Sequence, residues 1–220
     1  MLKNLLRVLM EHSAGILPVS KNDHGEVVFL LGKDARDGVF SDFGGKAELI
    51  DHGDPVNTAT REFYEETLGC ICNSPYSIRE RVKHMSVMVN GTTKKGNMYR
   101  MFMVEVPYSP CLPLRFKKVV HFLRYKNIGS AYIEKSELAW VTLDDMLKIP
   151  KRQVFADTIS KNMSVMRKIV STPWRSLCEE LRPAALAPEK SPPVHSTLVY
   201  QHPHAGKSLS ANKLNCVFLE

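Results

Sequence analysis

Three glutamates on one short stretch carry the clearest chemistry in this sequence. Glu62, Glu65 and Glu66 are spaced so that a helix through them places all three carboxylates on one face. Carboxylates this close repel one another, and the adjacent Arg61 offsets only part of their charge. Hard divalent cations such as Mg²⁺ prefer carboxylate oxygens. The spacing therefore indicates a metal site, although most glutamate runs on helices are solvated faces.

Two features favour the metal site over a solvated helix face. The pair Gly44-Gly45 precedes Arg61 by sixteen residues, and glycine lets the backbone approach a ligand or a metal closely. Strand-like segments flank the glutamate stretch on both sides, which predicts an α/β arrangement. Binding sites in proteins gather in the clefts of such arrangements. The glutamates and the glycines are thus expected to meet.

The segment from Gly45 to Gly69 resembles the signature of the Nudix hydrolases. That signature runs from a glycine through an acidic loop residue to an Arg-Glu pair, a Glu-Glu pair and a last glycine. The matching residues here are Gly45, Arg61, Glu62, Phe63, Glu65, Glu66 and Gly69, the last with one extra residue before it. The loop departs from the pattern: Asp51 stands six residues after Gly45, where the family has glutamate. Asp51 and Asp54 are both candidates for the acidic position.

The resemblance implies an α/β fold, a three-layer α/β/α Nudix sandwich with a mixed sheet. It also implies an enzyme that cleaves the phosphoanhydride bond of a nucleoside-diphosphate derivative with Mg²⁺ or Mn²⁺. In the family, Glu62, Glu65 and Glu66 would hold the metal, with the carbonyl of Gly45, and Arg61 would orient the glutamates. Such a cluster neutralises oxyanions and positions a water.

A later loop offers a general base. The segment from Tyr132 to Val141 resembles the family's last loop and strand, with an acid shortly before an aromatic residue. Glu134 and Glu137 are the candidates, and Glu134 is preferred because it lies six residues before Trp140, as in mRNA-decapping Nudix enzymes. The alternative is that both are solvated loop acids.

The resemblance implies a nucleotide-containing polyanion as substrate, with capped RNA the leading candidate. The segments Phe40–Gly45 and Arg61–Gly69 are similar to Nudix proteins of large DNA viruses, a group known to remove mRNA caps, releasing m7GDP, and to hydrolyse diphosphoinositol polyphosphates. The other candidates are nucleotide sugars, dinucleoside polyphosphates and nucleoside triphosphates. A Nudix-like module that binds RNA or nucleotide without catalysis is a further alternative.

A basic segment supports the RNA hypothesis. Residues 115–126 mix five cations with aromatic rings, the combination that RNA-binding surfaces use. The alternative is an amphipathic helix whose apolar residues are core and whose cations are solvated. The candidate substrate-binding residues are Lys46, Lys117, Lys118, Arg124 and Tyr125.

Alternating strands and helices must position these residues. Ser13–Ser20 and Val27–Lys33 predict a hairpin, and Pro55–Leu68 predicts a helix capped by Asp54. Further strands are expected at Arg81–Val89, Asn97–Val106 and Leu138–Val141. Leu114–Lys126 is either a helix or an inserted basic segment, and further helices are expected at Leu143–Leu147 and Phe155–Val170.

Length and composition set the domain organisation. The chain has 220 residues, a formal net charge of +7 and 44% hydrophobic residues, values of a globular protein with a polyanionic partner. We expect an N-terminal extension at 1–11, a Nudix domain at 12–170 and a flexible Pro-rich tail at 171–220. Five cysteines without a C-x-x-C pair favour a reduced, cytoplasmic setting, and no apolar stretch is long enough to span a membrane.

Overall fold

The computed structural model describes residues 12–128 and 132–181. The predicted extension at 1–11 and the predicted tail beyond residue 181 lie outside the described residues. None of the described helices combines the length and apolar character needed to cross a membrane.

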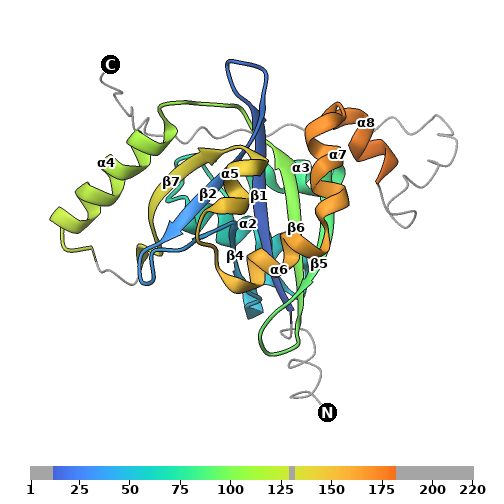
Figure 1. Ribbon diagram of the computed structural model, residues 1–220. Helices are drawn as coiled ribbons and strands as arrows, with labels where there is room; N and C mark the ends of the chain where they lie inside the picture. The colour runs from blue at the N-terminus through green and yellow to red at the C-terminus, as the bar shows by residue number, and fades with distance from the viewer. Residues whose placement is uncertain (1–11, 129–131, 182–220) are drawn as a thin grey trace, which may run out of the picture. The chain divides into compact units, whose positions relative to one another are not determined.

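A seven-stranded mixed sheet forms the middle layer (Figure 1). Its main path runs β3-β2-β1-β6-β5, with β4 paired to β1 and β7 paired to β2. Strands β1 and β6 are parallel, and the other pairs are antiparallel. The strands are β1 (His12–Lys21), β2 (Val27–Asp34), β3 (Phe40–Ser41), β4 (Phe43–Lys46), β5 (Ser86–Thr92), β6 (Met98–Glu105) and β7 (Lys135–Val141).

Alternation along the strands divides the core into two clusters, one on each face of the sheet. Ala14 and Ile16 of β1 face one cluster, whereas Leu17 and Val19 face the other. The first cluster is covered by α2 (Pro55–Glu66), α3 (Tyr76–His84) and α4 (Leu112–Tyr125), and a 3₁₀ turn, η1 (Leu49–Asp51), precedes α2. The second is covered by α5 (Leu143–Lys148), α6 (Gln153–Lys161), α7 (Met163–Ser171) and α8 (Trp174–Glu180). The α/β/α sandwich with a mixed sheet, predicted from the sequence, is confirmed.

Two predicted elements were wrong in extent. In the segment Arg81–Val89, which was predicted to be a strand, the first residues form the end of α3, and β5 starts only at Ser86. The helix extends this far because Ile78 and Val82, four residues apart, are both buried on one helix face. The helix predicted at Phe155–Val170 is two helices that meet at Asn162. The side-chain amide of Asn162 donates to the Thr158 and Asn90 carbonyls, and such local bonds compete with a continuous helix.

The packed fold continues past the predicted boundary at residue 170. Helix α8 buries Trp174, Leu177 and Cys178 in the second core cluster. The Trp174 indole Nε1 also donates to the Met85 carbonyl at 3.2 Å. Residues 171–181, which composition assigned to the tail, therefore belong to the folded domain.

Candidate active site

Helix α2 carries the glutamates and is fixed at both ends. Asp54 accepts a hydrogen bond from the Val56 amide at 2.9 Å and caps the N-terminus, as predicted, with Pro55 in the first turn. At the other end Leu68 and Gly69 adopt left-handed backbone conformations with φ of 52° and 67°. The buried ring of Phe63 anchors the helix on the sheet. The acidic face is thereby held in one orientation.

Arg61 donates hydrogen bonds to three carboxylates around the acidic face. Its Nη1 donates to Glu62 Oε1 at 3.0 Å and to Glu65 Oε2 at 3.1 Å. Its Nε and Nη2 each donate to Asp51 at 3.0 Å, and Nη2 also donates to the Lys46 carbonyl. Burial alone would lower the pKa of Arg61, but these carboxylates raise it. Arg61 thus ties α2 to η1 and β4.

Asp51 is the loop acid that joins this network. Its side chain is almost fully buried and accepts from Arg61, from the Glu48 amide at 2.8 Å and from the Thr58 hydroxyl at 3.0 Å. Burial opposes ionisation, but these bonds hold the pKa of Asp51 below its ordinary value. Asp54, the other candidate, caps α2 instead. Of the two acids that the sequence left open, only Asp51 pairs with Arg61.

Glu62 lies against the double-glycine bend. A Cβ at Gly45 would overlap the Glu62 carboxylate, so only glycine admits this close approach. Burial raises the pKa of Glu62 to about 7, although Arg61 opposes the shift. The contact predicted between the glutamate helix and the glycines is therefore present, at this residue.

Glu66 is buried and already has two partners. Its Oε2 accepts from the Gly44 amide at 2.8 Å, and its Oε1 lies 3.1 Å from the ammonium of Lys135. Burial raises the pKa of Glu66 to about 8, against the opposing effect of Lys135. Sequence reasoning missed Lys135, which is fully buried beside the glutamates. The signal was the charge balance, because three neighbouring carboxylates required more positive charge than Arg61 supplies.

The two base candidates have different surroundings. The charge of Glu134 contributes to the raised pKa values of Glu62 and Glu65, after burial and the opposing effect of Arg61. Each also has an ion pair at the protein surface, Glu134 with Arg36 at 3.9 Å and Glu137 with Lys33 at 3.4 Å. The preference for Glu134 as the base stays a prediction.

The residues present suit a divalent cation. Four carboxylates surround two cations, which leaves an excess of two negative charges when all four are ionised: Asp51, Glu62, Glu65 and Glu66 against Arg61 and Lys135. Hard oxygen donors with that excess match Mg²⁺ or Mn²⁺. Within the described residues, no three His, Cys, Asp or Glu side chains are already arranged around one metal position. Glu62 and Glu66 instead direct oxygens to Arg61 and Lys135.

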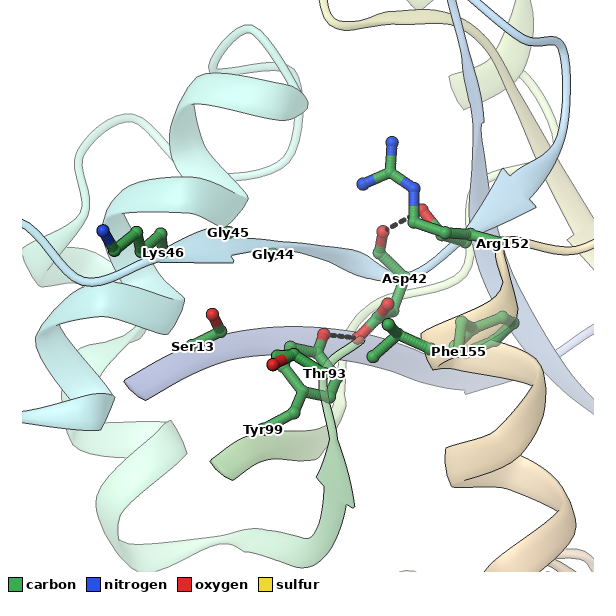
Figure 2. Close-up of a pocket in the computed structure, with 11 residues that line it drawn as sticks. Ser13, Asp42, Gly44, Gly45, Lys46, Thr93, Tyr99, Arg152 and Phe155 are labelled. Atoms are coloured by element: carbon green, nitrogen blue, oxygen red, sulfur yellow. Dashed lines mark hydrogen bonds between the residues drawn. The ribbon is translucent and has the colours of Figure 1, made fainter. Parts of the chain in front are cut away.

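A pocket of about 160 Å³ is lined by Gly44 and Gly45, the glycines that also contact the glutamates (Figure 2). It shares the bend Gly44-Gly45 and Lys46 with the acidic site. Tyr99 donates a short hydrogen bond to Asp42 at its floor. Burial raises the pKa of Asp42 to about 6, and the Tyr99 bond opposes the shift. The other lining residues are Ser13, Ser41, Thr93, Arg152, Val154 and Phe155.

The predicted substrate-binding residues separate into two groups. Lys46 lines the pocket, whereas Lys117, Lys118, Arg124 and Tyr125 lie exposed on α4, which packs against β7. Among the described residues, no hydrogen bond or ion pair joins these four side chains to the glutamates. Residues 115–125 of this segment lie in α4, with Phe116 and Val120 buried, as the amphipathic alternative predicted.

Comparison with known proteins finds similarity in structure only. No family model and no curated protein matches the chain. Among solved structures, it resembles the Mycobacterium smegmatis Nudix hydrolase RenU, with 17% identity over 73% of this chain and 90% of that chain and a TM-score of 0.46. A Caenorhabditis elegans Ap4A hydrolase complex has 17% identity over 73% and 95% of the chains, with a TM-score of 0.43.

A third structure is the NUDIX domain of Shewanella oneidensis NrtR complexed with ADP ribose. It has 13% identity over 72% of this chain and 87% of that chain, and a TM-score of 0.43. All three identities are under 25% and all three TM-scores are under 0.5, so these similarities transfer no substrate or activity. The function must be inferred from the site itself.

Proposed function

We propose that this chain hydrolyses a pyrophosphate linkage in a nucleotide derivative with Mg²⁺ or Mn²⁺. The observation that carries the proposal is that two glycines belong to both features: Gly44 and Gly45 contact the glutamates Glu66 and Glu62 of α2, and both glycines also line the adjacent pocket. A bound divalent cation would neutralise phosphate oxyanions and lower the pKa of a water. A nucleoside in the pocket would place its phosphates beside the carboxylates.

The chain's own groups have separate tasks in this reaction. Arg61 holds Glu62 and Glu65 through two hydrogen bonds, so their free oxygens are oriented before a cation arrives. Glu134, whose charge raises the pKa values of both glutamates, accepts the proton of the attacking water. Lys46, which lines the mouth of the pocket, attracts the substrate phosphates.

The pocket has the chemistry of a nucleobase site. Tyr99 and Phe155 supply aromatic surface, and Ser41, Asp42 and Arg152 supply polar groups at its edge. Ligand sites are typically apolar cavities with a few placed polar groups, and about 160 Å³ is the size of one heterocycle rather than of a whole nucleotide. The phosphates would therefore extend outside, towards the glutamates.

Capped RNA is the leading substrate. A second cavity, of about 650 Å³, shares Ser13, Lys46 and Arg152 with the first. It adds Lys94 and Lys95, so the opening offers two lysines beyond Lys46 for the phosphates of a longer nucleic acid. The alternatives are small polyanions, namely diphosphoinositol polyphosphates, nucleotide sugars, dinucleoside polyphosphates or nucleoside triphosphates. A binding module without catalysis is the remaining alternative.

One assay separates these functions. The full chain is incubated with capped RNA and, in parallel, with the small polyanions, with Mg²⁺ or Mn²⁺ present. We expect release of m7GDP from capped RNA, and its loss in Glu62→Gln. Fast turnover of a small polyanion without m7GDP release contradicts the decapping proposal. Tight binding without turnover of any substrate contradicts the enzymatic one.

A further inference from the structure

Lys135 is the feature of the site that the family resemblance leaves unexplained. Its side chain is fully buried, and its ammonium lies 3.1 Å from Glu66 Oε1 and 2.8 Å from the Ser41 hydroxyl. A buried lysine is costly unless it is paired. The fold therefore holds a fixed positive charge at a carboxylate that the resemblance assigns to a divalent cation.

The surrounding structure is shaped to admit this side chain. A Cβ on Gly32 would lie 2.9 Å from Lys135 Cδ and 2.9 Å from the Phe43 ring. Only a glycine at position 32 leaves room for the aliphatic stem of the lysine, which passes beside Phe43. The ammonium then lies 6.0 Å from the centre of that ring.

A β-bulge turns Lys135 inward. Leu138 of β7 is buried, and regular alternation from Leu138 would place Ser136, and not Lys135, on the same face. The register between β2 and β7 shifts at this point: Lys33 pairs with Glu137, but Asp34 pairs with Lys135. Bulges are frequent next to functional sites, where they re-aim a side chain.

We propose that Lys135 is a built-in counter-cation that makes Glu66 a positioning residue, so that divalent cations bind this chain through Glu62 and Glu65. In this arrangement Lys135 neutralises Glu66, and Glu66 in turn holds the Gly44 amide. The next residue, Gly45, is the one that lies against Glu62. Lys135 thereby fixes the bend without contacting the metal. The inference rests on the proposed metal dependence and deepens it.

The test measures Mn²⁺ binding to the substrate-free full chain, by the loss of the free Mn²⁺ electron paramagnetic resonance signal. The variants are Glu62→Gln, Glu66→Gln and the double variant Lys135→Met/Glu66→Gln, which is neutral at both positions and close to isosteric. We expect Glu62→Gln to weaken binding about tenfold or more. The double variant removes a neutral pair and no ligand, so its affinity should stay within about threefold of the wild type.

Glu66→Gln alone leaves the Lys135 charge unpaired, so its loss of affinity should be largely restored in the double variant. A double variant that binds Mn²⁺ as poorly as Glu62→Gln overturns the proposal, because Glu66 would then be a ligand. A wild-type chain that binds no Mn²⁺ also overturns it. Circular dichroism verifies that each variant is folded.

A crystal of the wild-type chain soaked in Mn²⁺ provides a measurement that needs no variant. Anomalous density at Glu62 and Glu65, with Glu66 still on Lys135, supports the proposal. Density on Glu66 with Lys135 displaced overturns it. Neither of these two measurements depends on turnover. If Mn²⁺ binds at Glu62 but no nucleotide is hydrolysed, only the proposed function is contradicted. If the chain hydrolyses nucleotide with Mn²⁺ bound to Glu66, only this inference is contradicted.

Discussion

Arg61 and Asp51 form a two-point ion pair, in which Nε and Nη2 of the arginine donate to the two carboxylate oxygens at 3.0 Å each. Both side chains are largely buried. The pair connects the helix that carries the glutamates to the turn before it. It uses the planar fork of arginine, which lysine does not reproduce.

Loss of this pair should destabilise the fold. Asp51→Asn leaves the buried Arg61 charge short of a partner, so we expect a loss of about 3 kcal/mol in the free energy of unfolding. Asp54→Asn is the matched control, because asparagine caps a helix as well as aspartate does, and should change stability by less than about 0.5 kcal/mol. Urea unfolding measures both. Equal losses in the two variants would contradict the assignment of Asp51 as the loop acid.

Replacement of the proposed base should slow catalysis without loss of metal. Glu134→Gln should lower kcat by about 10² to 10⁴, while Mn²⁺ affinity stays within a few-fold of the wild type. Glu137→Gln, which loses only an exposed pair with Lys33, should retain kcat within about twofold. Steady-state kinetics on the preferred substrate distinguish them. A larger defect in Glu137→Gln would reverse the assignment.

The buried carboxyl of Asp42 should make stability depend on pH. Burial raises its pKa to about 6, with the Tyr99 hydrogen bond opposing the shift. An acid with a raised pKa stabilises the fold below its unfolded-state pKa of 3.8, and this contribution is lost as the pH rises through about 6.

The variant Asp42→Asn keeps an acceptor for Tyr99 and cannot ionise. Relative to the wild type, it should therefore gain about 2 kcal/mol between pH 4 and pH 7, because a pKa difference of one is worth about 1.36 kcal/mol and most of the Asp42 difference falls in that range. Unfolding of both proteins across that range measures the difference. A constant difference would show that Asp42 does not titrate there.

The basic opening and α4 are separate candidates for RNA contact. The double reversal Lys94→Glu/Lys95→Glu changes the charge of the cavity beside the site and should raise KM for capped RNA about tenfold. Lys117→Glu/Lys118→Glu applies the same charge change to exposed positions on α4. Both variants are assayed on capped RNA and on a cap dinucleotide, whose turnover should not change. A larger effect from the α4 variant would move the RNA path to that helix.

The helix α2 and its acidic face could be predicted because their determinants are local. Asp54, Pro55 and the glutamate spacing lie within one segment, and helix geometry alone fixes which side chains share a face. The two β-rich runs on either side of the turn from Asn22 to Gly25 likewise predicted the hairpin of β1 and β2. These features need no information about distant parts of the chain.

Tertiary structure alone decided which charges meet. Lys135 reaches Glu66 because a bulge between β2 and β7 reverses its direction, and no alternation pattern reveals a shift that depends on the paired strand. The choice of Asp51 over Asp54 likewise depended on where Arg61 points. Helix α8 joined the domain because the far face of the sheet had apolar surface to cover. Local sequence determines the face of an element, whereas long-range packing determines what that face contacts.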